Sequence, residues 1–232
     1  MRLALLADIH GNAHALSAVL SAARQEGVQR LLCAGDFVGY YYQPDACLDL
    51  LSDWQVDAVR GNHDVMLAEL IEQPSLAAEL RARYGSGLEV AASVLTPDRL
   101  AALAALPVQR RITMDAMSIL LCHGTPWDTN TYVYPDADES VFRRCAESGA
   151  DIVVMGHTHH RLDLRRGNAR LLNPGSVGQP RDRTPGAAWG LLDTDTGAYH
   201  QRIEQYDSEP VKSRARALDP HLPYLWEVLD RR

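Results

Sequence analysis

The stretch Leu3–Asn12, which reads LALLADIHGN, is a short apolar run that ends in an aspartate and a histidine. Four later stretches repeat this arrangement: LLCAGD at 31–36, VDAVRGNHD at 56–64, SILLCHG at 118–124 and IVVMGHTH at 152–159. Short apolar runs with such endings predict buried strands whose C-terminal ends carry polar side chains. Strand ends along one edge of a sheet converge in space, so we expect the five polar clusters to share one site.

The chemistry-bearing residues of these clusters are aspartate, asparagine and histidine, and five of the nine histidines of the chain lie in them. Their oxygen and imidazole donors suit divalent metals such as Mn²⁺, Fe²⁺ or Zn²⁺. A single aspartate or histidine of this kind is more often a structural residue. Five clusters in order, each after a predicted strand, instead indicate a metal site.

The ordered clusters resemble the motifs of the calcineurin-like metallophosphoesterase superfamily. They are Asp8-Ile9-His10, Gly35-Asp36, Gly61-Asn62-His63-Asp64, His123-Gly124 and Gly156-His157-Thr158-His159. The chain length of 232 residues and the later segment 173–181 (NPGSVGQPR) are similar to the compact bacterial and archaeal phosphodiesterase branch. The resemblance implies an α/β fold, namely a two-sheet β-sandwich flanked by helices (αββα).

The same resemblance implies a set of metal ligands. Asp36 would bridge two divalent ions, because one carboxylate must contact both. The remaining ligands fall into two sets, Asp8, His10 and His159 for one ion and Asn62, His123 and His157 for the other. We expect Mn²⁺, with Fe, Zn, Ni or Mg as alternatives. Two such ions about 3.5–4 Å apart activate a bridging hydroxide and neutralise phosphoryl oxygens, which is the chemistry of phosphoester hydrolysis.

Other residues are candidates for contact with a substrate. The resemblance places His63 beside the phosphate, where an imidazole can protonate the leaving oxygen, so His63 and Asp36 are the predicted catalytic residues. Asp64 either orients His63 or is structural. Arg181 follows a predicted strand and either contacts a substrate phosphate or is a surface arginine in a turn.

Aromatic residues are concentrated in the two loops that follow Asp36 and His123. These residues are Tyr40, Tyr41, Tyr42, Trp127, Tyr132 and Tyr134. Loops of this kind form the rim of a site, and flat rings there can stack on a nucleobase. We therefore take Tyr41 and Tyr42 as candidate substrate contacts. The alternative is that the rings hold the loops together.

Composition limits the class of protein. A hydrophobic content of 46% and a charged content of 23% are ordinary for a globular domain, and no apolar run approaches the roughly 20 residues of a membrane-spanning helix. The apolar start is too short for a signal peptide, so we expect a cytoplasmic protein. A net charge of −7 disfavours non-specific binding to nucleic acid but not binding of a small phosphorylated substrate. The four cysteines form no C-x-x-C pair, and we expect buried core thiols.

The order of predicted elements supports one large domain. Strands at 3–7, 30–34 and 56–60 alternate with helices at 13–26 and 44–53, which predicts a parallel sheet with crossover helices. Residues 64–106 are mostly helical, with breaks at Pro74 and Pro97. Later strands are expected at 108–114, 117–122, 151–155, 161–165, 169–172, 187–193 and 198–205, with a turn at Asp115-Ala116 and a helix at 138–147. We assign residues 1–206 to a metallophosphoesterase domain and 207–232 to a tail that ends in a docked helix near 224–229.

The predicted function is hydrolysis of small or nucleotide-like phosphodiesters by a dimetal phosphodiesterase. Two alternatives are enzymes of other substrate classes: a phosphomonoesterase such as a protein phosphatase, and a dinucleoside polyphosphate hydrolase. A third alternative is a non-catalytic metal-binding scaffold. Scaffolds of this kind tend to lose ligand positions or the catalytic histidine, whereas each of these positions is filled here.

Overall fold

The structure is a computed structural model of the 232-residue chain, and it describes residues 1–114 and 117–232. Within these residues ten strands form two five-stranded sheets. The first sheet, in the order β10-β9-β1-β2-β3, contains β1 (Arg2–Leu6), β2 (Arg30–Cys33), β3 (Val56–Ala58), β9 (Ala187–Asp193) and β10 (Tyr199–Glu204). The second sheet, in the order β4-β5-β6-β8-β7, contains β4 (Gln109–Met114), β5 (Met117–Cys122), β6 (Ile152–Val154), β7 (Leu162–Arg166) and β8 (Ala169–Asn173).

Helices begin where the sequence supplies a cap or a proline. The Asn12 side chain accepts a hydrogen bond from the Ala15 amide (3.1 Å) at the start of the first helix, and Pro44 and Pro97 occupy first turns. The α-helices are α1 (Ala13–Gln25), α2 (Pro44–Ser52), α3 (Asn62–Glu72), α4 (Ala77–Tyr84), α5 (Gly87–Val94), α6 (Pro97–Ala104), α7 (Glu139–Ala146), α8 (Glu209–Leu218) and α9 (Tyr224–Glu227). Two 3₁₀ turns are η1 (Pro74–Leu76) and η2 (Val228–Asp230).

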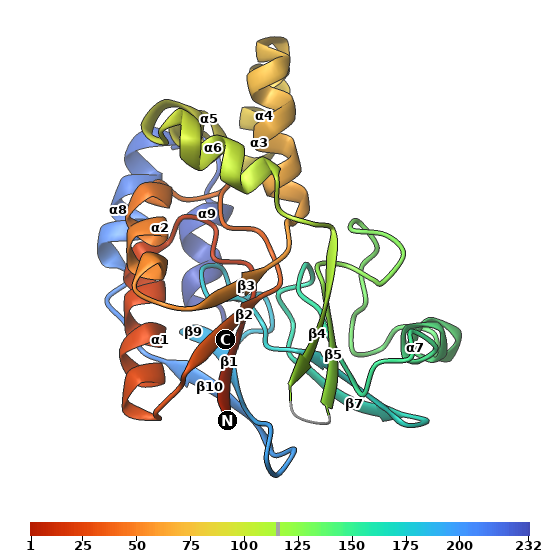
Figure 1. The fold of residues 1–232 in the computed structure, drawn as a ribbon. Coiled ribbons are helices and arrows are strands. Elements are labelled where there is room, and N and C mark those ends of the chain that lie inside the picture. The colour runs from red at the N-terminus through yellow and green to blue at the C-terminus, as the bar shows by residue number, and fades with distance from the viewer. Residues whose placement is uncertain (115–116) are drawn as a thin grey trace.

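The two sheets pack face to face, and helices cover both outer faces (Figure 1). Helix α1 packs on β9 and β10 of the first sheet, and α7 packs on β7 and β8 of the second sheet. Helices α3 to α6 form a group beside the sandwich, next to the ends of β3 and β4 (Figure 1). The predicted αββα architecture is therefore confirmed.

Alternation along the strands divides the core into layers. In β1, Leu3 and Leu5 face the second sheet, whereas Ala4 and Leu6 face α1 and α2. Strand β5 follows the same rule, because Ile119 and Leu121 lie between the sheets and the residues that alternate with them face α7. A strand covered on both faces must be apolar throughout, which explains the continuous apolar runs of the sequence.

Within each sheet, the strands that carry the polar clusters run parallel to one another. Strand β1 pairs in parallel with β2, β2 with β3, and β5 with β6. The C-terminal ends of parallel strands lie at the same edge of a sheet, so the loops after them meet at one place. The first and last residues of the predicted strands lie within about two residues of those of the observed strands. The expected turn at Asp115-Ala116 lies outside the described residues.

The C-terminal segment, residues 207–232, folds back onto the loop after β2. It contains the ten-residue helix α8, which the sequence reasoning did not expect, and the short helix α9 near the expected terminal helix. Its Val211, Ala215 and Leu225 form a buried cluster with Tyr41 and Tyr42. The segment is thereby tied to a loop that carries a metal-ligand motif.

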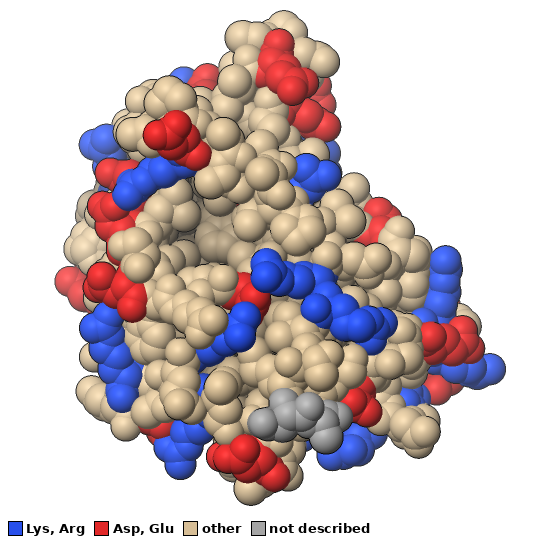
Figure 2. Space-filling view, viewed as in Figure 1, with Lys and Arg blue, Asp and Glu red and all other residues tan. Residues whose placement is uncertain are grey.

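Other expectations from composition concern the thiols and the surface. All four cysteines are buried and free, as predicted. None of the helices in the described residues is both long and apolar enough to cross a membrane. On the face shown in Figure 2, acidic and basic side chains are interspersed, and basic side chains gather over the edge strands β3 and β4. Arg30 of β2 and Arg110 of β4 form ion pairs with the buried Asp57 of β3.

Candidate metal centre and active site

Backbone strain is concentrated in the loops that carry the predicted ligands. Among the described residues, seven non-glycine residues have φ between 51° and 67°. Five of them are predicted metal ligands, and a sixth is Tyr40; these six are Asp8, His10, Asp36, Tyr40, His157 and His159. Residues other than glycine rarely adopt this left-handed backbone conformation, and those that do so cluster at functional sites. The local strain allows several side chains from short loops to point toward one centre.

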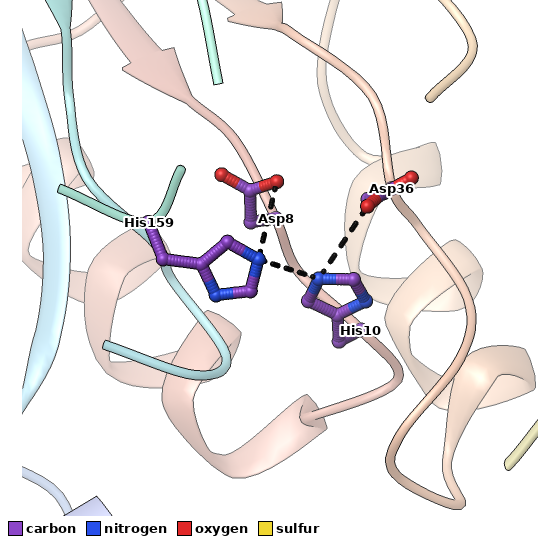
Figure 3. Close-up of side chains that lie close together, drawn as sticks. All are labelled: Asp8, His10, Asp36 and His159. Carbon is purple, nitrogen blue, oxygen red and sulfur yellow. Dashed lines mark hydrogen bonds and ion pairs between the residues drawn. The ribbon is translucent and has the colours of Figure 1, made fainter. Parts of the chain in front are cut away.

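Asp8, His10, Asp36 and His159 form the first group of side chains (Figure 3). One donor atom of each lies within 4.8 Å of the others, and all four side chains are buried. The Nε2 atom of His10 lies 3.1 Å from Nε2 of His159 and 3.5 Å from Oδ2 of Asp36. The Oδ1 atom of Asp8 lies 3.6 Å from Nε2 of His159. Residues as far apart in the chain as Asp8 and His159 thus converge on one point.

A second group contains Asp36, His123 and His157, again with donor atoms within 4.8 Å of one another. The Nε2 atom of His123 lies 3.3 Å from Oδ2 of Asp36 and 3.0 Å from Oδ1 of Asn62. Asp36 Oδ2 therefore lies between the two groups, close to one imidazole of each. This is the position that a bridging carboxylate requires.

The outer hydrogen bonds of the histidines fix which ring nitrogen faces inward. Nδ1 of His10, His123 and His159 lies 2.9, 2.6 and 2.6 Å from the carbonyls of Val38, Ala34 and Gln179, respectively. Because a carbonyl can only accept, each Nδ1 must carry a proton, and each Nε2 faces the centre, where it can bind a metal in its unprotonated form. In His157 the roles of the two nitrogens are reversed. Its Nε2 carries the proton and donates to the Asn130 carbonyl (3.1 Å), so the unprotonated Nδ1 is the atom that can bind a metal.

Burial and mutual charge set the protonation of the cluster. Burial lowers the pKa of His10 and His159 well below the usual range, and it lowers the pKa of His157 to about 4. These rings are neutral at neutral pH, which is the form that binds metals. Burial acts to raise the pKa of Asp36, but neighbouring histidines, led by His123, lower it well below its usual range. His123 itself has its pKa raised to about 9, because Asp36 outweighs the effect of burial.

The residues present fit two divalent metal ions. The Oδ2 atom of Asp8 is buried and has no hydrogen-bond partner within the described residues. Burial, together with the charge of Asp36, raises the pKa of Asp8 to about 7 although His123 opposes the rise. A buried carboxylate oxygen without a hydrogen-bond partner, beside inward-facing imidazole nitrogens, destabilises the fold unless a cation binds these atoms. Oxygen and imidazole donors of this kind suit Mn²⁺, Fe²⁺ or Zn²⁺.

Asp64 stabilises the loop of the bridging carboxylate. Its carboxylate accepts hydrogen bonds from the amides of Asp36 (2.9 Å), Phe37 (3.0 Å) and Gly61 (2.9 Å). The Asp36 side chain in turn accepts from the His63 amide (2.8 Å). Of the two roles considered for Asp64, the structure therefore supports the structural one, because its acceptors are used by backbone amides and not by the His63 ring.

His63 lies in the first turn of α3 and beside the first group. Its ring centroid is 4.9 Å from that of His10, 4.7 Å from Tyr40 and 4.9 Å from Tyr84. Burial lowers its pKa to about 4, although Asp36 opposes the shift. Its Nδ1 atom is buried without a hydrogen-bond partner among the described residues. Asn62 precedes it at the helix start and points toward His123, so adjacent residues serve different parts of the site.

Arg181 reaches the site from the loop after β8. Its Nη2 donates to the Tyr40 hydroxyl (2.8 Å) and to Oε1 of Gln179 (2.8 Å), and Nε donates to the same Gln179 oxygen (3.2 Å). No carboxylate of the described residues lies within ion-pair distance of this half-buried guanidinium. After burial, its charge is the main cause of the lowered pKa of His159. Arg181 is thus a cation without an acidic partner beside the metal ligands.

The segment 173–181 is the wall from which Arg181 projects. Its Val177 and Gly178 amides donate to the carbonyls of Ala7 and Asp8 at 3.0 and 2.9 Å, and the Ser176 hydroxyl donates to the Asp8 carbonyl (2.7 Å). These bonds hold the strained loop after β1. The segment therefore borders the site.

Tyr41 and Tyr42 do not face the metal-ligand groups. Tyr41 is 1% exposed and donates to the Leu225 carbonyl (2.9 Å), and Tyr42 is 8% exposed and donates to Oδ2 of Asp219 (2.8 Å). The structure gives no support to the expectation that their rings contact a substrate, because both rings are covered by the C-terminal segment. The alternative, in which the aromatic residues hold the loop, describes these two tyrosines.

Several residues near the site were missed by reasoning from sequence. Tyr84 contacts His63, Gln179 holds both His159 and Arg181, and Asn130 orients His157. Gln179 lies within a segment that the sequence did single out. Tyr84 has no motif around it, and only the packing of α4 and α5 brings it to His63.

Comparisons with known proteins match this chain over most of its length. The calcineurin-like phosphoesterase superfamily domain matches residues 1–197. The uncharacterized protein MJ0912 of Methanocaldococcus jannaschii is 29% identical over 212 residues, 82% of each chain. Phosphodiesterase YfcE of Escherichia coli is 25% identical over 205 residues, 84% of this chain and 89% of that protein. A metallophosphoesterase from Sphaerobacter thermophilus has a TM-score of 0.80 at 24% identity, covering 98% of this chain and 99% of that one.

This chain belongs to the calcineurin-like phosphoesterase superfamily. It is a metal-dependent phosphoester hydrolase, and its buried Asp and His clusters can hold metal ions. The relationship predicted from the five sequence clusters is thus confirmed.

Proposed function

We propose that the protein is a cytoplasmic two-metal phosphodiesterase that hydrolyses small phosphodiesters, with Mn²⁺ as its metal. The observation that carries the proposal is the position of Asp36 Oδ2, 3.5 Å from His10 Nε2 and 3.3 Å from His123 Nε2. A single buried carboxylate oxygen between two ligand groups supports a shared, bridging role. The name of the related Escherichia coli protein, a phosphodiesterase, favours diesters over monoesters.

Each side chain of the two groups has a role in this proposal. When bound, the metal pair supplies an activated water as nucleophile and neutralises phosphoryl oxygens. Asp8, His10 and His159 would hold one ion, Asn62, His123 and His157 would hold the other, and Asp36 would serve both. The carbonyls of Val38, Ala34, Gln179 and Asn130 keep the four imidazoles in the required orientation.

Arg181 and His63 act on the substrate in this proposal. The Arg181 guanidinium is held by Tyr40 and Gln179 and has no acidic partner, so a phosphate oxygen of the substrate can pair with it. His63 is neutral at neutral pH because burial lowers its pKa to about 4. An anionic phosphate beside the ring raises that pKa, which prepares His63 to donate a proton to the leaving oxygen.

Hydrolysis of aryl phosphates tests the proposal. The metal-loaded protein should hydrolyse bis(4-nitrophenyl) phosphate with a larger kcat/KM than 4-nitrophenyl phosphate. Asp36→Asn should abolish both activities, whereas Asp53→Asn, a matched change at an exposed aspartate outside the site, should not. A larger kcat/KM for the monoester would refute the diester preference. No hydrolysis of either ester by protein that holds two metals would support the scaffold alternative.

A further inference from the structure

Two exposed tyrosines stand in the loop that follows β5 and His123. Tyr132 is 49% exposed and Tyr134 is 37% exposed, and they are the two aromatic residues among the exposed large hydrophobic side chains of the described residues. Exposed rings gain nothing from the core, and a pair of them beside a functional site suggests recognition of a ligand. Neither residue has a role in the proposed hydrolysis.

The two rings are parallel and adjoin the second ligand group. Their centroids are 5.7 Å apart with an angle of 5° between the planes. Tyr132 also stacks on His157, with 4.0 Å between centroids and an angle of 28°. Tyr134 meets the edge of His160 at 5.1 Å. The platform, as we name Tyr132 and Tyr134, is thus continuous with a candidate metal ligand.

The loop that carries the platform is held in place by its own hydrogen bonds. Asp128 accepts from the Thr131 hydroxyl (2.5 Å) and from the Asn130 amide (3.1 Å). Asn130 in turn accepts from Nε2 of His157 through its carbonyl (3.1 Å). These three hydrogen bonds on the N-terminal side of Tyr132 reduce the entropy that the platform would lose on binding a ligand.

The platform adjoins the second ligand group, because Tyr132 stacks on His157. The aromatic rings around His63 adjoin the first group instead: His63 lies 4.9 Å from His10 between ring centroids, and Tyr40 and Tyr84 contact His63. The two sets of rings therefore lie beside different ligand groups.

We propose that Tyr132 and Tyr134 form a stacking surface for a planar ring on the substrate, so that nucleotide-like diesters are the preferred substrate class. This inference rests on the proposed phosphodiesterase function. His63 is assigned to the leaving oxygen and lies beside the first ligand group, whereas the platform lies beside the second, so we assign the ring on the platform to the group that stays on the phosphate. Every nucleobase has a π-face, so stacking of this kind tolerates different bases.

A pair of esters with one leaving group tests the inference. Thymidine 5′-(4-nitrophenyl phosphate) and methyl 4-nitrophenyl phosphate both release nitrophenolate, but only the first retains a nucleobase. The ratio of their kcat/KM values should fall about tenfold in Tyr134→Leu and in Tyr132→Leu, the effect of losing one stacked base contact. Tyr134→Phe and Tyr132→Phe keep the ring and should keep the ratio. An unchanged ratio in both leucine variants would overturn the inference.

Two further measurements separate the possible failures. The metal content of Tyr132→Leu shows whether this variant has merely disturbed the metal ligand His157. If it has, Tyr134→Leu tests the stacking role instead, because the ring contacts of Tyr134 are with Tyr132 and His160 and not with a metal ligand. If the metal-loaded protein hydrolyses neither ester, the proposed function fails, and calorimetric titration with adenosine monophosphate tests the platform alone. Tenfold weaker binding to Tyr134→Leu than to the parent protein supports the platform. Equal binding, or no binding to either, contradicts it.

Discussion

Replacement of Asp219 is the perturbation whose effect can be worked out most directly from the structure. This residue of the C-terminal segment is fully buried, and its Oδ2 accepts three hydrogen bonds: from the Tyr42 hydroxyl (2.8 Å), the Ser86 amide (2.9 Å) and the Ser86 hydroxyl (2.8 Å). Oδ1 lies 3.8 Å from Nε of Arg81. Asp219 therefore joins the loop after β2, which carries Tyr40, to the turn between α4 and α5, which directly follows Tyr84.

Asp219→Ala should destabilise the fold by roughly 3–5 kcal/mol, because it leaves three buried donors without their charged acceptor. In a chain of this size each kcal/mol lowers Tm by about 2–4 °C, so a fall of about 6–20 °C is expected. Thermal and urea unfolding followed by circular dichroism measures it. Asp230→Ala is the matched control, since this exposed residue of the same segment forms only a surface ion pair with Lys212 and should change stability by no more than about 0.5 kcal/mol.

The same substitution tests whether the C-terminal segment positions the site. Below the unfolding temperature, Asp219→Ala should retain both metals but have a lower kcat, because Tyr40 and Tyr84 no longer hold the His63 ring between them. Asp219→Asn keeps an acceptor oxygen and should recover part of both losses. A loss of stability under about 1 kcal/mol for the alanine variant would show that the three hydrogen bonds to Asp219 do not stabilise the fold as proposed. A destabilised variant with unchanged kcat would refute the positioning role.

Three other predictions concern the metal ligands and His63. Chelation should abolish hydrolysis and Mn²⁺ should restore it, because without metal ions the seven ligand side chains supply no cation that can activate a water molecule. Full activity of a preparation shown by elemental analysis to be metal-free would exclude the mechanism. Asp36→Ala should lower the metal content as well as the rate, since its carboxylate lies between both groups, and two tightly held ions per chain in this variant would rule out the bridge. His63→Ala should keep both ions and lower kcat by about 10²–10⁴-fold. The loss should be smaller for a nitrophenyl ester than for an alkyl ester, whose leaving group needs a proton. Equal losses would indicate that His63 only positions the phosphate.

The sequence by itself determined the class of the fold and the composition of the candidate metal site. Each of the five clusters follows an apolar run that forms a strand, and the parallel pairing of these strands brings their polar ends to one edge. Such a signal is local: a strand that is buried on both faces must be apolar, and the chain after it must turn. The donor chemistry of Asp8, His10 and His157 is likewise a property of the residue type, so it can be read without coordinates.

Roles that depend on the direction of a side chain were decided only by the tertiary structure. Tyr40, Tyr41 and Tyr42 are identical residues in a row, yet the first contacts His63 and the other two donate hydrogen bonds to Leu225 and Asp219 of the C-terminal segment. Asp64 follows His63 directly but binds backbone amides of another loop. Neighbours in sequence differ here because each side chain is held by a partner far along the chain, and pairings of that kind leave no periodic or local pattern.

The outer layer of the site depends on long-range packing in the same way. Tyr84 reaches His63 only because the turn after it is bound by Asp219, which is more than a hundred residues away. Helix α8 has a mostly polar sequence, and its few apolar residues become meaningful only against the tyrosine loop that they cover. The sequence thus specifies which donors form the centre, because strand patterns and residue chemistry are local. The structure alone specifies what surrounds that centre, because the surroundings are assembled from contacts between distant segments.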